Sequence, residues 1–276
     1  MLRKLIKHEF KATARLIPLL FLIVLTMSVA VHFALKLYDI NDLPVVLELL
    51  LALFMLLFGA ALGAVFIVCI VVMVMRFKRN LLGDEGYLTM TLPVSLSSLI
   101  WAKIIVSVIW LILAAIVDFI AVFIAYLTNS SIVDAFRDIW DILMRLSGGN
   151  AAVFIEGAVE LIIVGLFSVV ASCLNFYAAL SIGHGFARGK MGFSVLFYFV
   201  LSTAASITRI VILAALGQSV FSVTASMFLF GAGAGVADAM SEWRIQMATL
   251  GGLSLVQAAV FYFLTWINLK KRLNLE

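Results

Sequence analysis

Four ionisable side chains stand inside long apolar blocks of the sequence: Asp118, Glu156, Glu160 and Arg209. A charge in such a block is costly and is a candidate for function by default. Glu156 and Glu160 share one helix face because they are four residues apart. We expect Asp118, Glu156 and Arg209 at similar depth, so Arg209 is predicted to pair with Asp118, Glu156 or Glu160. Two interpretations stay open, a structural ion pair and a charge that lines or gates a pathway.

The sequence holds no arrangement typical of an active site or a metal site. Its three histidines fall in different predicted elements, and no H-E-x-x-H or Gly-x-Ser-x-Gly pattern occurs. No G-x-x-x-x-G-K-[ST] phosphate-binding loop occurs either. Cys69 and Cys173 lie inside apolar blocks, where a thiol packs as a small hydrophobic group. The chain by itself is therefore predicted to be no enzyme and to bind no metal or cofactor.

The elements that position these charges are predicted to be membrane-spanning helices. Hydrophobic residues make up 65% of the chain and charged residues 12%, and the mean hydropathy is +1.21. Each apolar block reaches the roughly 20 helical residues that a bilayer core requires. The fold class is thus an all-α integral membrane protein with six spans. We place them at Leu16–Tyr38, Val45–Met75, Ile104–Leu127, Ala151–Ser181, Gly192–Leu216 and Ala248–Leu269.

The basic residues orient these spans. Fourteen of the 19 lysines and arginines lie in the N-terminal segment, in the loops after spans two and four, and at the C-terminus. Positive charge gathers on the cytoplasmic side of membrane proteins, so both termini are predicted to be cytoplasmic. The chain is expected to be multi-pass in a cell membrane, in particular a bacterial plasma membrane. The charge favours contact with anionic membrane lipid and gives no reason to expect nucleic acid.

Three segments outside the spans have patterns of their own. Residues 1–15 put Leu2, Leu5, Ile6 and Phe10 on one face of a predicted interfacial helix. Residues 128–150 form a second amphipathic segment, expected on the outer surface. Residues 217–247 are apolar and rich in glycine, and a seventh span there would force the basic C-terminus outside. We therefore expect a re-entrant or outer hairpin between spans five and six.

The longest cytoplasmic loop, residues 76–103, is predicted to contain a short helix. Gly83 breaks the preceding helix, Asp84 is a candidate cap, and the helix from Glu85 ends at Pro93. Ser95 is predicted to cap the next helix, which leads directly into span three. A short rigid element joined at both ends to membrane helices can transmit a push that a flexible loop would absorb. The alternative is that this stretch is only an ordered turn.

This loop resembles that of the membrane subunits of the type-2 class of ABC exporters. The family's loop has an acidic residue, a small turn residue, leucines at helical spacing, a Leu-x-x-Pro-Val-Ser-like exit and an Ile-x-x-x-Lys-like entry to the next span. In this chain the Thr91–Val94 run departs from the usual spacing. The residues that correspond to the family's coupling helix are Asp84, Glu85, Gly86, Tyr87, Leu88, Leu92 and Pro93. The order of an N-terminal elbow helix, six spans, a coupling loop and a late hairpin is similar too.

The resemblance implies a permease that moves an amphipathic, peptide or lipid-like substrate outward. It implies a separate nucleotide-binding ABC ATPase subunit as partner, on which ATP and Mg²⁺ bind, and a second permease copy or a related permease as dimer partner. The N-terminal helix would act as an elbow against the same ATPase. Two other classes stay open: a secondary transporter driven by an ion gradient, and a membrane sensor or assembly subunit that transports nothing.

Overall fold

The computed structural model describes residues 2–38, 44–83, 86, 94–127, 134, 137, 140, 141, 144, 151–186, 189–217 and 236–273. Helices make up nearly all of these residues, and no strand occurs among them. The chain forms two compact units, Met1–Ala135 and Phe136–Glu276. The all-α class predicted from the sequence is confirmed.

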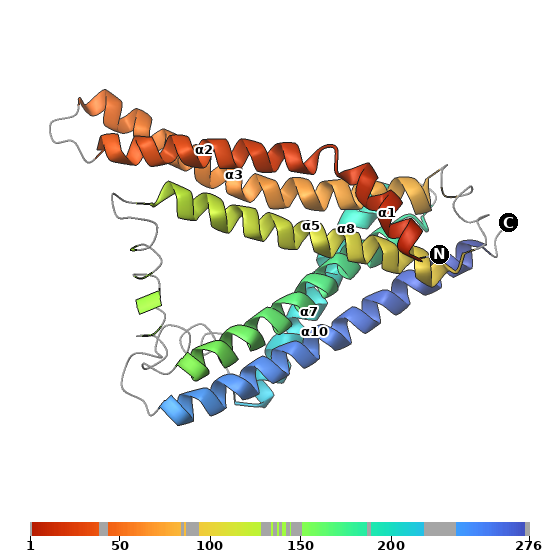
Figure 1. The fold of residues 1–276 in the computed structure, drawn as a ribbon. Coiled ribbons are helices and arrows are strands. Elements are labelled where there is room, and N and C mark those ends of the chain that lie inside the picture. Colours follow the sequence, from red (N-terminus) through yellow and green to blue (C-terminus); the bar gives the residue numbers. More distant parts are fainter. Residues whose placement is uncertain are drawn as a thin grey trace. The chain divides into compact units, whose positions relative to one another are not determined.

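Unit 1 is built from four α-helices. The short helix α1 (Leu2–Thr13) precedes α2 (Ile17–Tyr38), α3 (Val45–Phe77) and α5 (Leu96–Ala125), and a single π-helical turn, η1 (Lys78–Leu82), continues α3. Figure 1 shows α2, α3 and α5 running alongside one another, with α1 lying across one end of α5.

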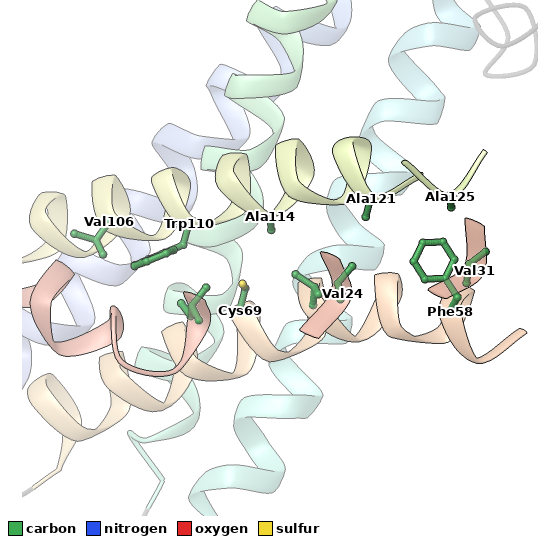
Figure 2. Packing of buried hydrophobic residues seen from close by; sticks show 11 residues of the cluster. Val24, Val31, Phe58, Cys69, Val106, Trp110, Ala114, Ala121 and Ala125 are labelled. Carbon is green, nitrogen blue, oxygen red and sulfur yellow. The ribbon is translucent and has the colours of Figure 1, made fainter. Parts of the chain in front are cut away.

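Small side chains let the long helices of unit 1 approach closely. Ala114, Ala121 and Ala125 of α5 are almost fully buried, as is Cys69 of α3. Figure 2 shows them packed with valines and Phe58 along the length of the bundle. Lipid tails are as apolar as the helix surfaces, so close packing through small residues is what holds membrane helices together.

The described part of unit 2 contains the helices α7 (Ala151–Gly183), α8 (Lys190–Ala215) and α10 (Val236–Leu273). Glu156 of α7 contacts Arg244 of α10, and Ser168, later in α7, contacts Ser254, later in α10, so these two helices run parallel. Helix α8 returns in the opposite direction after a tight turn in which Gly189 has φ +70°. A side chain at Gly183 would overlap the backbone nitrogen and hydroxyl of Ser194. Only glycine therefore allows this approach of α8 to the end of α7.

Within the part of the chain that the structure describes, six helices are long and apolar enough to cross a membrane, as the sequence predicted. Many large apolar side chains on them are exposed in the chain alone, as expected of surfaces that lipid covers. The second span continues to Leu82 and the third already begins at Leu96. The side chain of Ser95 caps that helix, accepting a bond from Ser98 N at 3.3 Å, and Gly83 ends the preceding one, both as predicted.

Three expected segments fall largely outside the described residues. These are the short helix after Gly83, the outer amphipathic segment 128–150 and the first part of the hairpin 217–247. The last part of that range, residues 236–247, is helical and continues without a break into the sixth span as α10. The predicted start of the sixth span at Ala248 therefore lies inside a longer helix, and the hairpin itself stays a prediction.

Candidate functional site

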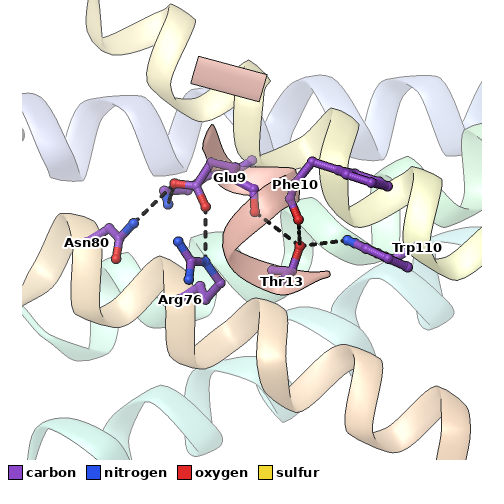
Figure 3. Close-up of polar contacts among 7 residues, drawn as sticks. Glu9, Phe10, Thr13, Arg76, Asn80 and Trp110 are labelled. Carbon is purple, nitrogen blue, oxygen red and sulfur yellow. Dashed lines mark hydrogen bonds and ion pairs between the residues drawn. The ribbon is translucent and has the colours of Figure 1, made fainter. Parts of the chain in front are cut away.

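One carboxylate, that of Glu9 in α1, binds three other segments of unit 1. Lys103 of α5 donates to Oε1 from 2.7 Å, and Asn80 of η1 donates to the same oxygen from 3.1 Å. Arg76 of α3 donates its Nε hydrogen to Oε2, also from 3.1 Å. Figure 3 shows the bonds from Arg76 and Asn80 reaching the Glu9 side chain. We call Glu9, Arg76, Asn80 and Lys103 the Glu9 cluster.

A second contact holds α1 one turn further along. The indole of Trp110 in α5 donates to the hydroxyl of Thr13 from 2.7 Å. That hydroxyl lies within donating distance of the carbonyls of Phe10 and Glu9, at 3.0 and 3.1 Å. The rings of Phe10 and Trp110 stack with centroids 4.7 Å apart and planes only 7° from parallel (Figure 3). Polar and aromatic contacts thus fix both the position and the rotation of α1 on α5.

The Glu9–Lys103 pair is largely shielded from water. The side chain of Lys103 is 5% exposed and that of Glu9 is 15% exposed, whereas that of Arg76 is 27% exposed. Burial alone would raise the pKa of Glu9, but the charge and hydrogen bonds of Lys103, followed by those of Arg76, outweigh burial and hold this pKa below its ordinary value. Glu9 is therefore ionised, and its carboxylate joins these two cations.

The helices joined by Glu9 are those that flank the loop at 83–95. Arg76 and Asn80 lie at the end of the α3–η1 helix, and Lys103 lies two turns into α5. Gly86 N donates to Gly83 O at 2.8 Å, which folds the chain back at the start of this loop. A Cβ at Gly86 would stand 2.9 Å from Leu81 O, so the turn requires a residue without a side chain. Both ends of the loop are thus attached to rigid helices and, through Glu9, to α1.

The predicted N-terminal helix is confirmed as a helix, and its two faces differ as expected. Arg3, Lys4, Lys7 and Lys11 are exposed on one face. Of the four apolar residues predicted on the other, Leu2 and Leu5 are half-buried, and Ile6 and Phe10 pack against the core of unit 1. This apolar face therefore covers protein at Ile6 and Phe10, where the sequence alone had suggested lipid.

Of the residues predicted to form the coupling helix, Gly86 is described and is buried. The others, Asp84, Glu85, Tyr87, Leu88, Leu92 and Pro93, lie outside the described residues.

The charged residues of unit 2 do not pair as the sequence suggested. Glu156 pairs with Arg244 of α10, and Arg209 donates to Gln257 Oε1 from 2.9 Å. Sequence spacing predicted a carboxylate partner for Arg209. It could not predict which levels of α7 and α10 lie side by side, and this alignment gives Glu156 to Arg244. A pair of Arg209 with Asp118 would join the two units and stays a prediction.

The register shows why Glu160 is out of reach of Arg209. Glu156 lies beside Arg244, and Ser168 Oγ lies 3.1 Å from Ser254 Oγ. These contacts put the level of Gln257 roughly 15 Å from that of Glu160 along the helices, farther than an arginine side chain extends.

Asp118 lies on the buried side of α5 between Ala114 and Ala121. Its side chain is 9% exposed, and neither carboxylate oxygen has a hydrogen-bond partner among the described residues. Within the same part of the chain, no group of three or more histidine, cysteine or acidic side chains is arranged to hold a metal ion. Asp118 is therefore an isolated polar group in an apolar bundle.

Glu9 and Lys103 are the functional candidates that the sequence analysis missed. In the sequence, Glu9 is a single acid among basic residues, and Lys103 is one of the residues that orient the chain. One signal was available: Glu9 falls on the stripe of Leu2, Ile6, Phe10 and Thr13, which is otherwise the side of α1 that packs on protein. A carboxylate on a packed stripe predicts a cationic partner on the facing helix.

Comparison with known proteins places the chain in no family. No family model matches it, and no curated protein or solved structure is significantly similar to it.

Proposed function

We propose that this chain is the permease subunit of an ABC exporter of the type-2 class, which moves an amphipathic, peptide or lipid-like substrate outward across a bacterial plasma membrane. In this proposal ATP and Mg²⁺ bind to a separate ATPase subunit. A second copy of the chain, or a related permease, completes a dimer.

The observation that carries the proposal is the attachment of α1 to both helices that flank the loop at 83–95. A motor that pushes on a loop moves membrane helices only if the loop ends are stiff. Here Gly83, from which the bond to Gly86 N folds the chain back, ends the helix before the loop. The Ser95 cap begins the helix after it. Glu9 then ties those helices together, so that α1, α3 and α5 move as one body.

The same arrangement gives α1 a role in coupling. Because α1 is bonded to Arg76 and Lys103, a partner that contacts the basic face of α1 would act on the same helices as one that contacts the loop. We infer that the ATPase subunit meets both surfaces, the loop and the exposed side of α1. Two contacts on one rigid body would transmit rotation as well as displacement.

The test is co-purification with an ATPase. The tagged chain is co-expressed with the ATPase encoded beside it, extracted in detergent, and compared with a Glu85→Arg, Leu88→Arg double variant. The proposal expects the wild type to retain the ATPase and the double variant to lose it. Asp141→Arg serves as the matched control, because it reverses one exposed charge in the segment predicted on the opposite side of the membrane. Retention of the ATPase by the double variant, or failure of the wild type to bind any, contradicts the proposal.

One observation favours a second candidate, a secondary transporter. Asp118 has no bonding partner among the described residues, and isolated carboxylates in membrane helices often carry protons or cations. Uptake or efflux by vesicles that contain the chain alone, driven by a proton or sodium gradient and abolished by Asp118→Asn, would favour this candidate. Absence of both gradient-driven transport and ATPase binding would favour a sensor or assembly subunit.

A further inference from the structure

Arg209 carries a charge that the surrounding helices leave without an anion. It lies in α8, about 9 Å from the end of that helix at Ala215, with partly buried Ile212 and exposed Leu216 on the same side of the helix. Its Nη2 donates to Gln257, and its buried Nε has no partner among the described residues. An arginine at such a depth normally has a carboxylate or another anion beside it.

No acid on the three helices of unit 2 can supply that anion. Glu156 is engaged by Arg244, and Glu160 is about 15 Å away along the helices. Asp238 and Glu242 precede Gln257 in the same helix by at least 22 Å or so, and α8 has no acidic residue. Among the described residues of α7, α8 and α10, no acidic side chain neutralises the guanidinium.

The neutral partner is itself held in place. Gln257 Nε2 donates to Ala205 O from 3.0 Å, which turns the amide oxygen toward Arg209. A glutamine fixed at both ends of its amide holds the guanidinium against α10 without cancelling its charge. Such a guanidinium keeps the planar set of donors that suits a phosphate or carboxylate group.

A polar column continues inward from Arg209. Ser202 lies two turns earlier on the same side of α8, where its hydroxyl accepts a bond of 2.7 Å from Asn175 Nδ2 of α7. The Asn175 side-chain oxygen is buried and has no partner among the described residues. Outward from Arg209, Ser168 and Ser254 form the next polar contact.

We propose that Arg209, positioned by Gln257, binds the anionic headgroup of an amphipathic molecule, a phosphate or carboxylate on an apolar chain. Ile212 and exposed Leu216, on the same side of α8 as Arg209, would contact the apolar chain while the guanidinium binds the headgroup. This inference rests on the proposed function only where it takes the bound molecule to be the exported substrate. The headgroup of a resident membrane lipid has the same chemistry and would bind without being transported.

The test measures binding by the chain alone, without any ATPase, so that its failure is distinct from failure of the exporter proposal. Native mass spectrometry of the protein in dodecyl maltoside follows bound dodecyl phosphate, with dodecyl trimethylammonium as the cationic counterpart. We expect saturable binding of dodecyl phosphate only, and an apparent Kd at least tenfold higher in Arg209→Gln. Gln257→Leu should weaken binding less than this, because the charge remains but is no longer positioned.

Two variants keep the test decisive. Arg244→Gln removes an exposed cation from the same unit and should bind dodecyl phosphate as the wild type does. Arg209→Lys keeps the charge without the planar donor set, and it should fold even if Arg209→Gln does not. Its affinity for dodecyl phosphate should lie between those of the wild type and Arg209→Gln. Competition by phosphatidic acid, but not by inorganic phosphate, would identify a lipid as the source of the headgroup; competition by inorganic phosphate alone would identify a water-soluble anion.

Equal binding by the wild type and Arg209→Gln would overturn the proposal, as would an equal loss in Arg244→Gln. A large gain in affinity for dodecyl phosphate in Asp118→Asn would overturn it as well, because it would show that Asp118 is the counter-ion of the guanidinium in the wild type.

Discussion

Lys103 donates to Glu9 across 94 residues of sequence, at 2.7 Å, and is almost completely buried while it does so. The bond joins the start of the chain to the first turns of the third span. It places the lysine's charge inside the protein, where the sequence had suggested only a charge that orients the spans. The tertiary structure thus gives Lys103 a role in attaching α1 to α5.

We predict that Glu9→Gln destabilises unit 1 by about 3 kcal/mol, because it removes the carboxylate to which both buried Lys103 and Arg76 donate. Thermal unfolding in detergent, followed by circular dichroism, measures the effect. Lys7→Gln, an exposed change on the opposite face of α1, should leave the unfolding temperature unchanged. A double variant, Glu9→Gln with Lys103→Met, should regain part of the loss; no recovery in the double variant would show that the pair is not the cause.

The pH dependence of stability should follow the lowered pKa of Glu9. A carboxylate whose pKa is lower in the folded protein adds stability above its ordinary pKa, here 4.5, and loses it as the pH falls through the folded value. The difference in unfolding temperature between the wild type and Glu9→Gln should therefore be constant from about pH 7 to pH 5. Below about pH 4 the two should converge. A difference that grows with acidification would contradict the assignment.

Gly183→Ala should separate α7 from α8, because the new methyl group would overlap the Ser194 backbone. We expect a loss of about 1–3 kcal/mol, as for other overpacked sites. Gly192→Ala is the matched control, since nothing lies within 4 Å of a Cβ there. Unfolding of the two variants in the same detergent compares them directly, and equal stability would show that the turn relaxes without cost.

Gly86→Ala tests the folded turn as part of the proposed coupling. Its Cβ would stand 2.9 Å from Leu81 O, so the start of the loop must shift. We expect the ATPase to co-purify with this variant as it does with the wild type. The increase in its rate of ATP hydrolysis on addition of substrate should be several-fold smaller than with the wild type. Gly63→Ala in α3, with open space around its Cβ, should behave as the wild type. An unchanged response in Gly86→Ala would separate the turn from coupling.

Local pattern predicted the helices well because their causes are local. Runs of apolar residues fixed the six spans, and the cap at Ser95 and the break at Gly83 were predicted from single residues. The start of the sixth helix was less well predicted. Residues 236–247 are polar enough to end a span, but α10, which packs against α7, is helical through them.

The sequence by itself determined that the chain is a six-span α-helical membrane protein with an amphipathic N-terminal helix, because hydrophobic length and periodicity act within each segment. Only the tertiary structure decided which charges meet. Glu9 pairs with Lys103 and Arg76, Glu156 with Arg244, and Arg209 bonds to a glutamine. These partners depend on the register and rotation of packed helices, which composition and spacing along one chain do not encode.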